Sequence, residues 1–304
     1  QSKLIEYMLK FLKDWTLPIA MVVGGVGYKV MGYISFLSPI LIFCMLLLTF
    51  CKISLKDIHF NTNHIWLLLI EIFGAVLIYY IVSPFNEIVA QGMMVCIICP
   101  TATAAAVVTG KLHGNVASIT TYTLLCNIAV AIAVPLIFPL VTHSENNMSF
   151  FEAFWIIIRK IFPLLICPFL LAQLMNYFTP KFHDKLANIS GLAFYLWAVA
   201  LALAMGITVK ALIEQPADGY TEILLAIGSL FTCALQFFLG KIVGKAYGNT
   251  IASGQSLGQK NTILAIWMCN TYLNPLSSLA AGCYVVWQNI FNSWQLYMER
   301  KNNP

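Results

Sequence analysis

Long apolar runs occur along almost the whole chain. Many of them are about 18–25 residues long, the length that a helix needs to cross a bilayer. Of the 304 residues, 60% are hydrophobic and only 10% are charged, and the mean hydropathy is +0.82. A soluble domain carries about 25% charged residues, so this chain has too few polar groups to cover its surface in water. The runs do not alternate with the period of two that a membrane β-barrel needs. The sequence therefore predicts an all-helical integral membrane protein surrounded by lipid.

Polar and glycine- or proline-containing segments divide the chain into ten expected spans. These are residues 15–33, 35–52, 65–83, 88–110, 115–140, 153–177, 187–209, 220–246, 250–271 and 275–298. The connections are short, and the longest hydrophilic ones are residues 141–150 and 210–219. We therefore expect a single transmembrane unit over residues 1–304, with no separate soluble domain.

The lysines and arginines predict the orientation of the chain, because cytoplasmic loops carry most of these residues. With the N-terminus inside, four of the 17 fall on the outer face (Lys29, Arg159, Lys160 and Lys210), Lys260 falls inside a span, and the other twelve are cytoplasmic. We expect both termini in the cytoplasm and the chain in a bacterial inner membrane. The net charge of +5 reflects the same asymmetry, so it does not indicate a nucleic-acid partner.

The sequence does not indicate a metal, a cofactor or an enzyme. The nine cysteines lie in or beside apolar runs, where they act as small packing residues. Cys96 and Cys99 form a CxxC without the second pair or neighbouring histidine that a zinc site needs. The five histidines fall in expected loops, and the spans contain no HExxH and no Ser/His/Asp set.

Two of the expected spans are interrupted in the middle. The fourth reads QGMMVCIICPTATAAAVVTG, and the ninth reads NTIASGQSLGQKNTILAIWMCN. Each is the fourth span of its half, and five spans per half would invert the second half relative to the first. Matched interruptions of this kind are typical of a transporter that binds its substrate near the midplane, since a broken helix presents free N–H groups to an anion. The alternative is a simple kink at Pro100 and a polar packing seam in the ninth span.

Three segments resemble motifs of the bile acid/sodium symporter family. They are CPTATAAAVVTGKLHGNVA (99–117), GQKNTILA (258–265) and NPLSSLAAGCYVVWQNIFNSW (274–294), in the family's order and at fitting spacing. The resemblance implies ten helices in a 5+5 inverted repeat. It also implies a panel domain (residues 15–52 and 153–209) and a core domain (65–140 and 220–298), with the broken fourth and ninth helices crossing in the core. An organic anion would reach the cleft between the two domains by alternating access.

The resemblance places Thr103, Asn261, Gln288 and Asn289 at substrate-facing positions. Thr101 joins them because Thr101 and Thr103 open the second half of the fourth span, where free N–H groups would face an anion. The amides of Asn261 and Asn289 are suited to orienting a carboxylate without trapping it. A hydrogen bond between helices is the commoner role of an Asn or Gln in a membrane helix, and this alternative stays open.

The sodium sites that the resemblance implies are altered in this sequence. The positions of one site hold Ala105, Ala106, Ile119, Thr123 and Ser256. These residues offer two hydroxyls and no carboxylate to a hard cation that prefers oxygen ligands. At the second site, a family glutamine aligns with Lys260, which follows Gln259, and another falls at or near Glu71.

We expect the ammonium of Lys260 to take the place of the bound cation, with Glu71 as its counter-charge. They are the only base and the only acid deep inside a span, and each alone costs roughly 2.5–3.5 kcal/mol at a helix centre. In two alternatives, Lys260 extends to the membrane interface or serves only as a structural tether. If it has a role in transport, Lys260 either carries a proton or is the permanent cation of a uniporter or exchanger.

The sequence thus predicts a secondary active or facilitative transporter of a small organic anion, bile-acid-like or a carboxylate, that does not need sodium. One alternative is a sodium-coupled symporter with a rearranged site. Another is a sensor or channel that is derived from the carrier fold and does not cycle. The sequence leaves the oligomeric state open and is compatible with a monomer.

Overall fold

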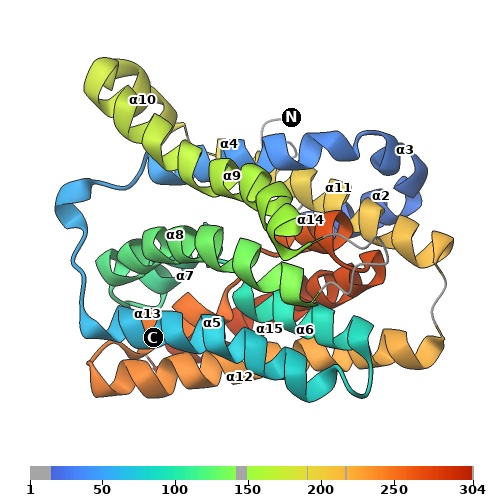
Figure 1. Cartoon of the computed structure of the whole chain (residues 1–304). Coiled ribbons are helices and arrows are strands. Elements are labelled where there is room, and N and C mark those ends of the chain that lie inside the picture. The colour runs from blue at the N-terminus through green and yellow to red at the C-terminus, as the bar shows by residue number, and fades with distance from the viewer. Residues whose placement is uncertain (1–14, 142–148, 190, 216–217, 303–304) are drawn as a thin grey trace, which may run out of the picture.

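The computed structural model describes residues 15–141, 149–189, 191–215 and 218–302, and within them the regular structure is entirely helical (Figure 1). The predicted all-helical class is therefore confirmed. The elements in chain order are α2 (Thr16–Val26), α3 (Tyr28–Tyr33), η1 (Ser35–Leu37), α4 (Ser38–Phe50), η2 (Leu55–Asp57), α5 (Thr62–Val82), α6 (Glu87–Ile98), α7 (Ala105–Lys111), α8 (Val116–Val141), α9 (Phe150–Phe178), α10 (Pro180–Asn188), α11 (Leu192–Glu214), α12 (Gly219–Ala246), α13 (Thr250–Gly258), α14 (Thr262–Tyr272), η3 (Pro275–Ser277) and α15 (Ser278–Asn302).

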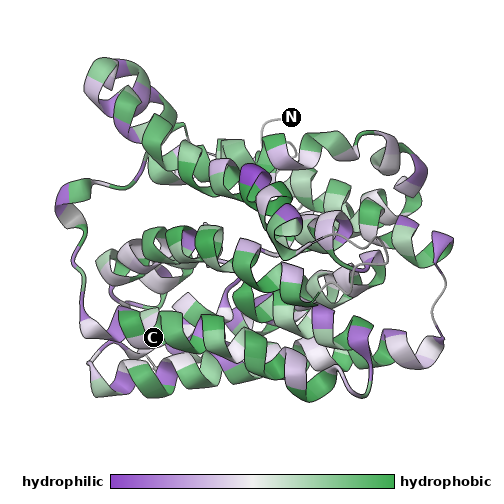
Figure 2. Cartoon of the chain, viewed as in Figure 1, coloured by the Kyte–Doolittle hydropathy of each residue, from purple (hydrophilic) through white to green (hydrophobic). Residues whose placement is uncertain are grey.

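Five helices, α5, α8, α9, α11 and α12, are long and apolar enough to cross a membrane. Large apolar side chains such as Phe73, Leu174 and Phe238 are exposed on them, and Figure 2 shows that hydrophobic residues make up most of the long helices. Such a surface suits lipid rather than water. The other expected spans coincide with helices that are short, interrupted or, in α15, rich in polar residues. The count of ten spans therefore stays a prediction.

The orientation of the termini also stays a prediction. Residues 1–14, which include Lys3, Lys10 and Lys13, and residues 303–304 lie outside the described part of the chain. The hydrophilic connection at 141–150 is likewise described only at its two ends.

The helices form two groups, which are joined by the packing of α8 against α9. In the first, α4 packs against α9 and α11, and α11 also packs against α2 and α3. In the second, α12 packs against α6, α13 and α15, and α5 packs against α6 and α8. Figure 1 shows α2, α4 and α9 on one side of the molecule and α5 and α12 on the other. These groups contain the segments expected for the panel and the core, whose division into two moving domains remains a proposal.

The two interrupted spans meet where their helices break. Pro100 disfavours helical backbone in the residue before it, and Cys99 is extended, with φ −61° and ψ 137°. The fourth span therefore leaves the helix between α6 and α7, and the ninth leaves it between α13 and α14. Ala102 N donates to Gln259 O and Asn261 N donates to Pro100 O, each at 2.8 Å, around an antiparallel bridge between Thr101 and Lys260. The broken helices thus satisfy each other's backbone, and the alternative of a simple kink at Pro100 is wrong.

Candidate functional site

Lys260 lies at this crossing and is completely enclosed by protein. Its Nζ is 2.9 Å from Glu71 Oε1, and both side chains are fully buried. Its backbone N–H donates to Gln288 Oε1 of α15 at 2.9 Å. The alternative in which Lys260 reaches the membrane interface is therefore wrong.

Glu71 accepts two further hydrogen bonds from one face of α8. Tyr122 Oη donates to Glu71 Oε2, and Cys126 Sγ lies 3.1 Å from Oε1. Because Tyr122 and Cys126 are four residues apart on a helix, their side chains lie side by side. The ammonium and the two donors give this buried carboxylate the partners that a buried polar group needs. The arrangement therefore suits a fixed pair of opposite charges that joins α5, α8 and the crossing.

Hydrogen bonds within the protein hold three of the predicted substrate residues near the crossing. Thr101 Oγ1 donates to Ser256 O at 2.7 Å. Asn261 Oδ1 accepts from Leu264 N at 3.2 Å and so caps the start of α14. Gln288 positions Lys260 through its backbone. In this conformation, the three residues stabilise the crossing.

The other two predicted substrate residues are close in sequence to residues of the crossing. Asn289 is half-buried, and its Nδ2 donates to Val285 O of its own helix at 2.7 Å. Thr103 is half-buried in the segment between α6 and α7. The structure brings the five residues near the crossing but does not gather them around one cavity.

Apolar residues occupy three of the five positions that the resemblance gives to the first sodium site. Ala105 and Ile119 are completely buried and cluster with Ala252, and Ala106 packs against them. Thr123 Oγ1 donates to the carbonyl of Ile119 on its own helix at 2.8 Å. An apolar cluster offers no oxygen ligands to a hard cation. The residues at these positions therefore do not fit sodium.

The remaining residues of the predicted cation site belong to α13 and its end. Ser256 is buried, and its carbonyl accepts the Thr101 bond. Gln259 O accepts from Ala102 N, while its buried Oε1 has no hydrogen-bond partner in the described structure. Among all the residues that the structure describes, no three His, Cys, Asp or Glu side chains group in a way that could hold a metal ion.

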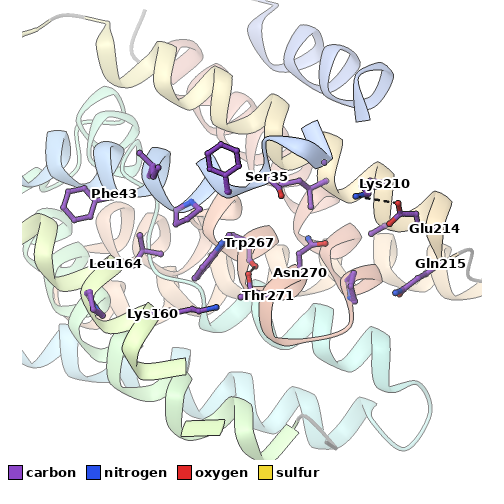
Figure 3. Close-up of a pocket in the computed structure, with 18 of the residues that line it drawn as sticks. Ser35, Phe43, Lys160, Leu164, Lys210, Glu214, Gln215, Trp267, Asn270 and Thr271 are labelled. Atoms are coloured by element: carbon purple, nitrogen blue, oxygen red, sulfur yellow. Dashed lines mark hydrogen bonds and ion pairs between the residues drawn. The ribbon is translucent and has the colours of Figure 1, made fainter. Parts of the chain in front are cut away.

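A cavity of about 960 Å³ lies between α4, α9, α11 and α14 (Figure 3). Its volume is within the range of about 300–1,000 Å³ that is usual for small-molecule sites. One part of the wall is apolar and is formed by Phe36, Ile40, Phe43, Leu164 and Trp267. Trp267 is five residues from the start of α14, about 7.5 Å along the helix axis. The cavity therefore extends close to the crossing.

Another part of the cavity wall is polar. It contains Lys160 of α9, Lys210, Glu214 and Gln215 at the end of α11, and Asn270 and Thr271 at the end of α14. None of the predicted substrate residues lines this cavity. Sequence reasoning missed these residues, although it placed Lys160 and Lys210 on the same face of the membrane, and this shared face was the only signal available.

Two histidines lie in helices, contrary to the expectation from the sequence. His183 belongs to α10, and His64 is the third residue of α5. His64 and Asn61 form a capping box, in which the side chain of each residue accepts from the backbone N–H of the other. The polar segment before the apolar run looked like a loop, but it is the first turn of the helix. His143 lies outside the described residues.

Comparison with known families gives one match. The sequence matches the family model described as the Sodium Bile acid symporter family over residues 39–215, which is more than half of the chain. The matched region contains Glu71 and the first broken helix, whereas Lys260 and the second broken helix lie beyond it. Comparison with the curated proteins finds no match.

Proposed function

This chain belongs to the sodium bile acid symporter family, a family of membrane transporters, and we propose that it carries a small organic anion without coupling to sodium. As an integral membrane protein, it would do so by alternating access. The panel segments (residues 15–52 and 153–209) would move against the core segments (65–140 and 220–298), which would form ten spans in two inverted halves.

The buried pair of Lys260 and Glu71 carries this proposal. In a sodium-coupled carrier, a dissolved cation supplies positive charge at the crossing and leaves during each cycle. Here an ammonium that is covalently part of the chain lies 2.9 Å from a buried carboxylate. This ammonium can supply the charge permanently, and the apolar cluster of Ala105, Ile119 and Ala252 supports the loss of the other sodium site.

The bonds around Glu71 favour the uncoupled form of this mechanism. Release of a proton from Lys260 would leave the carboxylate of Glu71 without its counter-charge inside the protein, which is costly. The donors Tyr122 and Cys126 bind the same carboxylate and hold it beside Lys260. We therefore favour a uniporter or exchanger over a proton-coupled carrier.

The position of the cavity supports alternating access. Its wall combines α4, α9 and α11 of the first helix group with α14, which packs against α15 and α6 of the second group. A change in the relative position of the two groups would therefore change its shape. The segment with Thr103 leads into α7, which packs against α13, whereas α14 leaves the crossing toward the cavity. Thr103, Gln288 and Asn289 are candidates for substrate contacts in a conformation that opens on that other side.

Transport in proteoliposomes tests the proposal. Uptake and counterflow of labelled taurocholate and of labelled short carboxylates would be measured in sodium, potassium and choline buffers, with and without a protonophore. We expect counterflow of at least one of these anions, at rates that neither sodium nor the protonophore changes by more than about twofold. A steep dependence on sodium would support the rearranged symporter, and binding without counterflow would support the non-cycling sensor.

A further inference from the structure

The cavity contains three charged side chains, and two of them compensate each other. Lys210 Nζ lies 3.7 Å from Glu214 Oε1, one helical turn away on α11. Both side chains are partly exposed, so the pair contributes little stability, but its charges cancel. In the described structure, no acidic group lies within 4.0 Å of Lys160 Nζ. The cavity therefore has a net charge of +1, carried by Lys160.

Lys160 and its neighbour Arg159 face different surroundings. The guanidinium of Arg159 lies over the ring of Trp155 at 5.0 Å, and neither residue lines the cavity. Successive residues on an α-helix differ in direction by about 100°, so Lys160 extends from α9 into the cavity, toward the end of α14 (Figure 3). One cation thus belongs to the outer surface of the helix and the other to the cavity.

The surroundings of Lys160 combine one charge with an apolar surface. Leu164 lies one turn further along α9, and Trp267 lies on α14 across the cavity. Asn270 uses one N–H of its amide for Ile266 O at 2.8 Å, which leaves the second N–H as a donor. An acid group near Lys160 and Asn270 would allow an attached apolar body to rest on Leu164 and Trp267.

We propose that Lys160 is the residue that selects for a negative charge in this cavity, and that it recognises the single acid group of an amphipathic organic anion. This inference rests on the proposed function, because it assigns the substrate's charge to the same transport cavity. A second acid group on the substrate would meet the Lys210–Glu214 pair, whose charges cancel, or an apolar wall. Monoanions are therefore preferred over dianions of the same size.

A native cysteine provides a test that does not require transport. Cys167 also lines the cavity and is the only exposed cysteine in the described residues; Cys44 and Cys283 are half-buried and the rest are buried. It lies seven residues after Lys160, nearly two turns along the same face of α9 and about 10 Å away. At that distance and at low ionic strength, one charge changes the local concentration of a charged reagent several-fold.

The experiment compares how fast two thiosulfonate reagents modify Cys167, one anionic (MTSES) and one cationic (MTSET). Purified wild-type protein, Lys160→Gln, Lys160→Arg and Arg159→Gln would be compared, with Cys167→Ser as the background. We expect Lys160→Gln to lower the ratio of the MTSES rate to the MTSET rate about three- to tenfold. Lys160→Arg should keep the ratio, and Arg159→Gln should change it less than twofold. Equal ratios in wild type and Lys160→Gln would overturn the inference.

Transport then separates this inference from the proposed function. In proteoliposomes, Lys160→Gln should raise KM for taurocholate about tenfold with little change in kcat, and Lys160→Arg should restore KM. If the protein transports taurocholate but KM is the same in wild type and Lys160→Gln, the inference fails and the proposed function stands. If the MTSES preference depends on Lys160 but neither taurocholate nor a carboxylate is transported, the proposed function fails and Lys160 still sets the charge of the cavity.

Discussion

At the scale of single residues, two contacts hold Lys260 in position. Its ammonium lies against Glu71, and its backbone N–H is bound by Gln288. A buried pair of this kind is not stabilising in itself, because both groups lose their hydration. It specifies a position instead, since neither charge can move away without leaving the other unpaired. This property is what a permanent replacement for a bound cation requires.

Removing one partner of the pair should therefore be more harmful than removing both. Lys260→Gln or Glu71→Gln alone leaves a buried unpaired charge, and we expect each to lower the free energy of unfolding by about 3–5 kcal/mol. The double variant should recover at least half of that loss. Thermal unfolding of the detergent-solubilised protein measures these values, with the exposed Lys245→Gln as a control that changes stability by less than about 0.5 kcal/mol. A double variant as unstable as the sum of the two single variants would mean that the pair is not coupled.

At the scale of helices, local patterns in the sequence predict where a span breaks, whereas the crossing of the two breaks was expected only from the family resemblance. Pro100 and the polar run before Lys260 are local features, and local features end helices. The bond from Asn261 N to Pro100 O joins residues that are far apart in the sequence, and no periodicity in either segment indicates that partner. The cavity was missed for the same reason. Trp267, Asn270 and Lys160 form its wall only because α9 and α14 pack in one particular way.

Glycines at helix contacts show which packing is indispensable. A Cβ at Gly24 of α2 would overlap the carbonyl oxygen of Ala202 on α11, whereas a Cβ at Gly25 would meet only Val209 Cγ2, at 3.7 Å. The first position therefore sets the distance between α2 and α11, and the second tolerates a larger side chain.

This difference between neighbouring residues predicts opposite effects of one substitution. We expect Gly24→Ala to destabilise the protein by about 1–3 kcal/mol, because the two helices must separate. Gly25→Ala should be neutral or stabilising by up to about 1 kcal/mol, because alanine favours the helix over glycine. Thermal unfolding in the same detergent compares the two variants. Similar melting temperatures would show that α2 and α11 can separate at little cost.

At the scale of the whole molecule, the proposed function depends on which side of the membrane the cavity faces. The distribution of lysines and arginines predicts that Lys160 and Lys210 lie on the outer face and Lys111 on the cytoplasmic face. The structure adds that Lys160 and Lys210 line one cavity, while Lys111 lies at the end of α7. The cavity would therefore receive an anion from outside the cell. The charge asymmetry of the sequence thus predicts the side of the membrane from which the cavity is accessible.

Labelling of single cysteines from one side of the membrane tests this assignment. A maleimide that cannot cross the membrane, added to intact cells, should label Cys167 in the cavity. Lys111→Cys in a Cys167→Ser background should be labelled only after the cells are permeabilised. Both reporters are exposed in the structure, so a difference between them reflects sidedness rather than burial. The opposite pattern would mean that the predicted orientation is inverted. Equal labelling of both residues before permeabilisation would mean that residue 111 is also accessible from outside the cell. Alternating access with a closed cytoplasmic side does not allow that result.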